Sequence, residues 1–221
     1  MAVPKHGYAK TLAAQPVGSG AELVSVEADL TRGLHNFSVV GLADKAVDEA
    51  RDRVSAAIRH SGYKSPKQQN KRIVISLSPA DLKKEGSHYD LALALAYLIA
   101  AGDVEPLEEK VLFVGELALD GTLRAVKGVL PQVLAAKRKG VKTIFVPPGN
   151  SREALLADGV VVYSPDSLAE LLQHLNGEKP LTRLVRDRRV SAPPPALDLA
   201  DVKRQESAKR ALEIAAAGRH N

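Results

Sequence analysis

One segment restricts the possible folds of this chain more than any other: a strand pattern, a polar turn and an apolar helix in direct succession. Residues 72–77 (RIVISL) place the apolar side chains Ile73, Ile75 and Leu77 at every second position, which is mostly the pattern of a strand with one buried face. Residues 91–101 (LALALAYLIAA) are apolar on every side but too few to span a bilayer, which predicts a helix inside a globular core. The turn between them, residues 79–90 (PADLKKEGSHYD), is the kind of connection that can present a reactive group.

Strand and helix patterns alternate along the rest of residues 1–176, which we predict to form one mixed α/β domain. Asp120-Gly121 is a strong hairpin signal, and Asp90 is the expected N-cap of the apolar helix. The other expected strands are 23–30, 37–40, 113–119, 123–126 and 143–146, and the expected helices are 44–61, 90–101, 129–139 and 167–175.

Two further pieces follow this domain. Residues 177–197 contain four arginines and three consecutive prolines, which favour an extended, semi-rigid linker. Residues 198–221 predict a short amphipathic helix that stops at Gly218. Its expected apolar face consists of Ala208, Ala211, Leu212 and Ala215.

The formal net charge of +5 is concentrated in the last part of the chain. Residues 1–176 contribute only +1 and residues 177–221 contribute +4, so the globular part is not broadly basic. The chain has no cysteine, and it shows neither an apolar signal core nor a membrane-spanning run. We therefore expect a cytoplasmic protein without membrane contact.

Four stretches of the chain resemble one known family in the same order. They read FSVVGLADKAVDEARDRVSAAI (37–58), SLSPADLKKEGSHYDLALA (76–94), GELALDGTLRAVKGVLP (115–131) and DLADVKRQESAKRALEIAAAGRHN (198–221). This pattern resembles the ComM/YifB proteins, the magnesium-chelatase-like AAA+ ATPases, and more distantly the Lon protease domain. The resemblance implies a mixed sandwich of the ribosomal-S5-domain-2 and Lon proteolytic type, followed by a Pro-rich linker and one partial AAA+ helix.

In such relatives, ATP and magnesium are bound by a Gly-rich phosphate loop, and the sequence G-x-x-x-x-G-K-[ST] occurs nowhere in this chain. We therefore expect a fragment that holds no cofactor itself. The resemblance also places Asp201, Val202 and Gln205 beside the adenine, but Arg204 stands where the family has glycine.

Aligned with the Lon protease turn, the chain lacks both members of the Ser-Lys dyad: His88 falls on the nucleophile and Leu130 on the lysine. A shifted dyad of Ser87 and Lys127 is the alternative, although a slip of one residue would point Ser87 elsewhere. Glu85, His88 and Asp90 are possible metal ligands, but neighbouring lysines and the absence of a second nearby histidine favour a polar turn. We expect neither an enzyme nor a metal site in this chain.

Two groups of cations are candidates for contact with nucleic acid, because phosphate contacts require charge rather than a specific geometry. One is a loop interleaved with amides and the other is the arginine cluster of the linker; a solubilising spacer is an equal alternative for the cluster. The candidates are Lys64, Lys67, Lys71 and Arg72 in the loop, and Arg183, Arg186, Arg188 and Arg189 in the linker.

Three functions remain open. The resemblance implies a non-proteolytic domain that is the assembly and DNA-facing layer of a hexameric motor, joined to its own AAA+ domain. The relatives it points to drive branch migration during uptake and recombination of DNA. A cryptic Ser-Lys peptidase and an interaction module without DNA contact are the alternatives.

Overall fold

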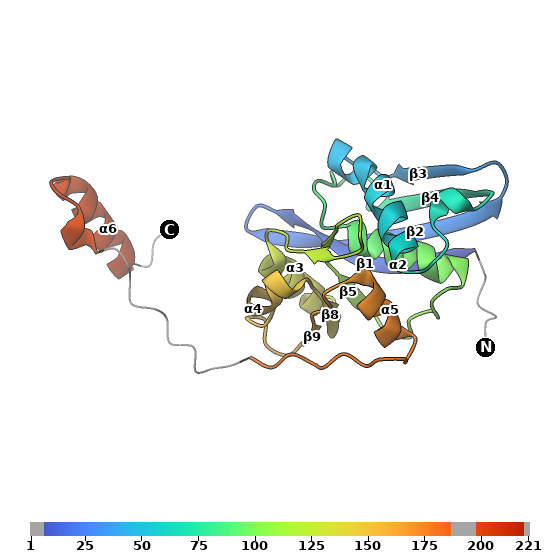
Figure 1. The fold of residues 1–221 in the computed structure, drawn as a ribbon. Coiled ribbons are helices and arrows are strands. Elements are labelled where there is room, and N and C mark those ends of the chain that lie inside the picture. Colours follow the sequence, from blue (N-terminus) through green and yellow to red (C-terminus); the bar gives the residue numbers. More distant parts are fainter. Residues whose placement is uncertain (1–6, 187–197, 219–221) are drawn as a thin grey trace. The chain divides into compact units, whose positions relative to one another are not determined.

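In the computed structural model of the chain, residues 7–186 and 198–218 are described, and they fall into two units. The first unit is a mixed α/β domain (Figure 1). Its strands are β1 (Tyr8–Val17), β2 (Gly20–Arg32), β3 (Asn36–Val40), β4 (Lys71–Ser78), β5 (Val111–Phe113), β6 (Glu116–Leu117), β7 (Leu123–Arg124), β8 (Thr143–Phe145) and β9 (Val161–Tyr163). Its helices are α1 (Lys45–His60), α2 (Asp90–Ala101), α3 (Val129–Arg138), α4 (Ser151–Ala154) and α5 (Leu168–Leu175), with short 3-10 turns at Pro66–Gln68 and Pro148–Asn150.

Seven strands form the central sheet in the order β3-β4-β2-β1-β5-β8-β9. Only β2 runs antiparallel to its neighbours, β1 and β4, while the other pairings in this sheet are parallel. The mixed α/β class and the four main helices are therefore confirmed. Strands β1 and β9 were not predicted, and β2 is longer than the expected strand 23–30.

Helices cover both faces of this sheet (Figure 1). Successive residues of a strand point to opposite faces, and Ala13 accordingly packs in one core cluster while Ala14 packs in the other. The first cluster contains side chains from α1, α2 and α5, and the second contains side chains from α3 and α4. The domain is thus a three-layer structure with two cores.

Helix α2 is buried on all sides, as its apolar composition predicts: every residue from Asp90 to Ala100 is buried. The sheet covers one side of it and α1 packs on the helix from another. The helix ends at Gly102, whose φ of +85° is the left-handed conformation of a common helix stop.

The prediction of one continuous strand over residues 113–119 is wrong in one respect, because the chain leaves the main sheet after Phe113. Gly115 lies between β5 and β6, donates its N–H to the carbonyl of His88 and accepts a bond from the N–H of Leu91. These bonds tie residue 115 to the start of α2 rather than to a neighbouring strand. The Asp120-Gly121 hairpin is confirmed, with β6 and β7 paired across it.

The segment expected to begin a linker at residue 177 is packed on the domain as far as Arg186. Leu181 packs against the first core and Leu184 against the second, and the Leu184 N–H donates to the carbonyl of Val162 in β9 at 2.9 Å. Residues 187–197, with the three prolines, lie outside the described residues.

The second unit contains a 3-10 turn, Leu199–Asp201, and helix α6, Glu206–Gly218. Helix α6 confirms the short helix that was expected within residues 198–221 and its end at Gly218. None of its residues is buried, and Leu212 and Ile214 are both more than half exposed.

A prediction concerns Gly41, at the turn between β3 and α1. A Cβ there would overlap the carbonyl oxygen of Leu77, and its φ is +112°. We expect Gly41→Ala to lower the free energy of unfolding by at least about 2 kcal/mol in urea denaturation. Gly33→Ala is the control, because nothing lies within 4 Å of its added Cβ. Equal stability of the two variants would show that the turn is not constrained in this way.

Candidate functional site

The turn before α2 is fixed to the start of α1 through Asp44. One carboxylate oxygen of Asp44 accepts the Val47 N–H at 2.8 Å and so caps α1, and the other accepts the Gly86 N–H at 3.3 Å. The backbone of Lys84 adds two bonds, to the Leu42 carbonyl and from the Asp44 N–H. Two distant segments are therefore held in one rigid arrangement.

The inner side of this turn rests on β1. The Gln15 side-chain oxygen accepts the Glu85 N–H at 3.0 Å and the Tyr89 hydroxyl at 2.7 Å. Lys84 is buried, and its ammonium donates to the carbonyl of Pro79 within the turn. Burial lowers the pKa of Lys84.

His88, at the predicted nucleophile position, is a buried core side chain. It is 6% exposed, its ring lies 4.3 Å from the Tyr89 ring, and its Nε2 has no hydrogen-bond partner among the described residues. Burial lowers the pKa of His88 to about 4, so the imidazole is neutral near pH 7. Leu130, at the predicted lysine position, packs against the second core.

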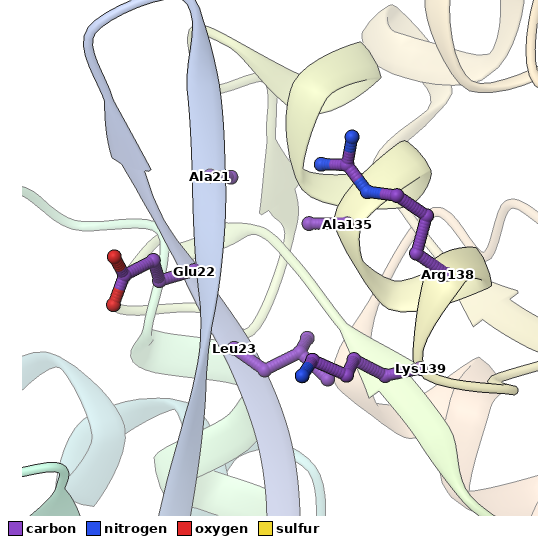
Figure 2. A pocket seen from close by; sticks show the side chains of 6 residues that line it. All are labelled: Ala21, Glu22, Leu23, Ala135, Arg138 and Lys139. Carbon is purple, nitrogen blue, oxygen red and sulfur yellow. The ribbon is translucent and has the colours of Figure 1, made fainter.

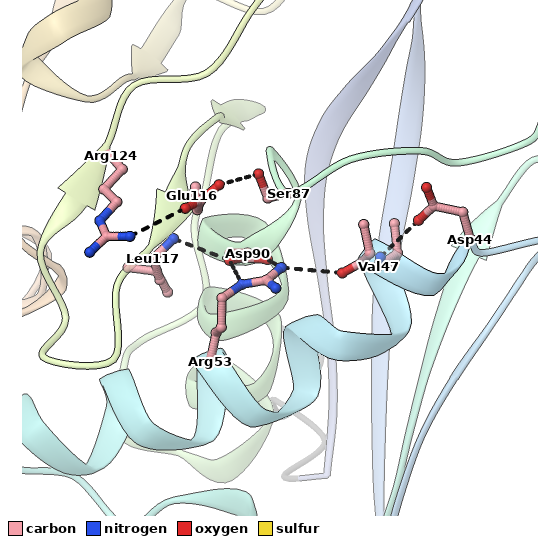
Figure 3. A network of polar contacts seen from close by, with 9 residues as sticks. Asp44, Val47, Arg53, Ser87, Asp90, Glu116, Leu117 and Arg124 are labelled. Carbon is pink, nitrogen blue, oxygen red and sulfur yellow. Dashed lines mark hydrogen bonds and ion pairs between the residues drawn. The ribbon is translucent and has the colours of Figure 1, made fainter.

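Ser87 has a partner other than the lysine of the alternative dyad. Its hydroxyl donates to the Glu116 carboxylate, and Glu116 lies 3.8 Å from the Arg124 guanidinium (Figure 3). Lys127 is exposed, and within residues 7–186 no bond joins it to Ser87. Glu116 and Arg124 were not among the predicted site residues, because they become neighbours of Ser87 only through the hairpin.

Asp90 is the most unusual charged group of the site, and its expected role as N-cap is wrong. The N-cap of α2 is Tyr89, while the fully buried Asp90 carboxylate accepts two bonds from Arg53 of α1, at 2.8 and 3.0 Å. It also accepts the Leu117 N–H at 3.2 Å (Figure 3). Burial raises the pKa of Asp90 to about 6, although the bonds from Arg53 act in the opposite direction.

Asp90 is therefore tied to Arg53, and Glu85 forms an ion pair with Lys83. Across the described ranges, no three acidic or histidine side chains gather in a way that could hold a metal ion. In the same part of the chain, no helix is long and apolar enough to cross a membrane.

The predicted basic loop is divided by the structure. Lys64 and Lys71 line one groove, together with Arg32 of β2, which sequence reasoning missed. Lys67 is instead paired with Asp52 of α1 at 2.7 Å. Arg72 follows Lys71 in β4 and points to the opposite face of the sheet.

A second hollow with basic residues lies between β2 and the end of α3, with a volume of about 590 Å³. Figure 2 shows the Lys139 side chain reaching toward Leu23, while the Glu22 carboxylate points away from α3. Ala21, Leu23 and Ala135 contribute apolar lining, and Arg138 stands beside Lys139.

Among the linker arginines, Arg183 is exposed and Arg186 lies 3.8 Å from Asp158 of the domain. Arg188 and Arg189 lie outside the described residues. In the second unit, Asp201 ends the 3-10 turn, Val202 is 43% exposed and Gln205 directly precedes α6. Arg204 has a φ of +61°, so the position where the resemblance expects glycine has a glycine-like backbone.

Comparison with known proteins identifies the family. The family described as subunit ChlI of Mg-chelatase matches residues 26–150, and the family described as magnesium chelatase, subunit ChlI, matches residues 198–221. The chain belongs to this magnesium-chelatase ChlI family. The predicted resemblance to ComM/YifB proteins is also confirmed by two relatives.

Competence protein ComM of Haemophilus influenzae is 41% identical over 210 residues, covering 93% of this chain. Uncharacterized protein YifB of Escherichia coli is 43% identical over 209 residues, also 93% of this chain. The chain spans 40% of the length of each of these relatives. Lon protease 1 of Sorangium cellulosum is 28% identical over 138 residues, which is 61% of this chain and 17% of that protein. The Lon-like part of the fold prediction therefore has weaker support than the mixed α/β class.

A prediction follows from the buried ion pair. We expect Arg53→Ala to lower the free energy of unfolding by about 3–5 kcal/mol at about pH 8, because it leaves a buried carboxylate without its counterion. Since the pKa of Asp90 is about 6, the carboxyl is mostly neutral at about pH 5, and the loss should be smaller there.

Urea denaturation at both pH values measures this difference. The control is Lys45→Ala, which removes a cation that is 91% exposed and 3.6 Å from Glu49, and should cost less than about 1 kcal/mol at either pH. A loss for Arg53→Ala that is independent of pH would contradict the assigned titration of Asp90.

Proposed function

We propose that this chain is a non-proteolytic, Lon-like domain that forms the assembly and DNA-facing layer of a ComM/YifB-type AAA+ ATPase. In this proposal the longer protein is a cytoplasmic homo-hexamer that uses ATP and magnesium. It drives branch migration of DNA during recombination and transformation. The observation that supports this most is the similarity to Competence protein ComM over 93% of the chain.

The geometry of the turn before α2 supports a non-proteolytic role. A Ser-Lys peptidase needs a hydroxyl whose proton a nearby lysine amine can accept. Here the Ser87 hydroxyl donates to Glu116, and the two aligned dyad positions hold His88, a buried neutral imidazole, and the hydrocarbon side chain of Leu130. The bonds of Asp44 and Gln15 give this turn a structural role in the domain.

The second unit supports the proposed connection to an ATPase module, because residues 198–221 match the ChlI model separately from the domain. In the proposal, Asp201, Val202 and Gln205 belong to the adenine side of that module. The phosphate-binding loop and the magnesium ligands would lie in the part of the relatives that this chain does not span. The domain would then contribute contacts to neighbouring subunits and to DNA.

The proposed function predicts that the chain binds DNA without sequence preference and that the binding weakens steeply with salt. Fluorescence anisotropy with two unrelated duplexes, from about 50 to about 200 mM salt, measures this affinity. An absence of binding at the lowest salt would favour an interaction module without DNA contact.

The chain should also leave casein intact, because Ser87 has no lysine base. Casein hydrolysis that is abolished by Ser87→Ala would instead establish the peptidase alternative. Ser25→Ala is the matched control, since the Ser25 hydroxyl also donates to a glutamate, Glu27, but Ser25 belongs to strand β2 and not to the turn.

A further inference from the structure

The groove that contains Lys64 and Lys71 is formed by segments far apart in the sequence. Strands β2 and β4 pair so that Arg32 lies directly opposite Lys71. The segment after α1 adds Lys64, and the residue after the helix stop of α2 adds Asp103. The groove has a volume of about 800 Å³ and is also lined by the amide side chains of Gln68, Gln69 and Asn70.

Three cations in this groove face a single carboxylate. The ion pairs within residues 7–186 and 198–218 involve other cations, and none includes Arg32, Lys64 or Lys71. Like charges directly opposite each other on antiparallel strands destabilise a sheet, and Arg32 and Lys71 are such a pair. The arrangement therefore costs folding free energy that an anion in the groove would offset.

Asp103 does not balance these cations. Burial raises the pKa of Asp103, while Lys71 and Lys64 act in the opposite direction, so the carboxylate lies within the electrostatic reach of both lysines. One carboxylate against three cations leaves the groove with an excess of two positive charges. The amides supply hydrogen-bond donors without adding negative charge.

The segment that carries Lys64 is held in place before any ligand binds. The hydroxyl of the buried Tyr97 of α2 donates to the Lys64 carbonyl at 2.9 Å and accepts the Gln69 amide at 2.8 Å. The Gln68 side-chain oxygen accepts the Ser65 N–H at 3.0 Å, which leaves the Gln68 NH₂ available to a ligand. Such pre-organisation reduces the ordering cost of binding.

We propose that this groove binds the phosphate backbone of DNA, with Arg32, Lys64 and Lys71 each neutralising a phosphate. The assignment rests on the proposed DNA-facing function and gives it a location. The lining residues include no aromatic ring on which a base could stack, so the contacts we propose are to phosphates rather than to base faces. Single-stranded and duplex DNA present the same phosphodiester chemistry.

The test compares two triple variants that remove the same charge. Arg32→Ala/Lys64→Ala/Lys71→Ala empties the groove of cations, and Arg138→Ala/Lys139→Ala/Lys142→Ala removes one arginine and two lysines that are exposed at the end of α3 and beyond it. Anisotropy is measured with a single-stranded oligonucleotide and with a duplex. For the groove variant, the log–log salt slope should become shallower by about 2 on single strands and by about 3 on duplex, and affinity should fall about tenfold or more. The α3 variant should bind as the wild type does.

Two results separate the groove from the proposed function. If the groove variant binds DNA as tightly as the wild type, or if both variants lose binding equally, the proposed DNA site in the groove is overturned. The DNA-facing function then still stands. An absence of wild-type binding overturns both.

Thermal unfolding provides the stability control. Removing like charges should leave the groove variant at least as stable as the wild type. If the triple variant does not fold, Arg32→Ala alone should still reduce the slope by about 0.7 to 0.9; an unchanged slope would overturn the proposal.

Discussion

The complete burial of α2 is the constraint on which the rest of the domain depends. A helix that is apolar on every side must be covered on every side, and the sheet, α1 and the chain before β6 together provide that cover. The first turn of this helix nevertheless carries a carboxylate, Asp90, with no exposure to solvent. Arg53 must therefore reach it from α1, which fixes the two helices relative to each other. The same carboxylate accepts the Leu117 N–H and so positions the hairpin as well.

Two titratable groups near the start of α2 respond to pH in opposite directions. Asp90 has a pKa raised to about 6, so its contribution to stability is full below the unfolded value of 3.8 and is lost as pH rises through 6. His88 has a pKa lowered to about 4, so its contribution is full above the unfolded value of 6.5 and is lost as pH falls through 4. Between about pH 4 and 6 the two contributions oppose each other. Asp90 and His88 lie in the turn that resembles a catalytic turn by its position. Here both side chains are buried, and their contributions to stability change with pH in opposite directions.

Elements that depend on residues close together in the sequence were predicted correctly. Features that depend on contacts between residues far apart in the sequence were not. The apolar run of α2 and the Asp-Gly hairpin each follow from neighbouring residues, and both were predicted correctly. Asp90 was assigned as an N-cap because aspartate before an apolar helix commonly caps it, but Arg53, 37 residues away, decides its role. Strand β1 buries Thr11 and Gln15 among its alanines, so its pattern lacks the apolar–polar alternation that identifies a strand.

The same distinction explains why the candidate nucleic-acid surface could be predicted only in part. A domain with nearly balanced charge can present a strong local field only where its cations are separated from its carboxylates. Lys67 is close in sequence to Lys64 and Lys71, but Asp52 neutralises it, and Arg72 lies on the other face of β4. Arg32 is 39 residues from Lys71 in the sequence and directly opposite it in the sheet. Strand register rather than composition therefore selects the cations that share the groove, and a register is set by the pairing of whole strands.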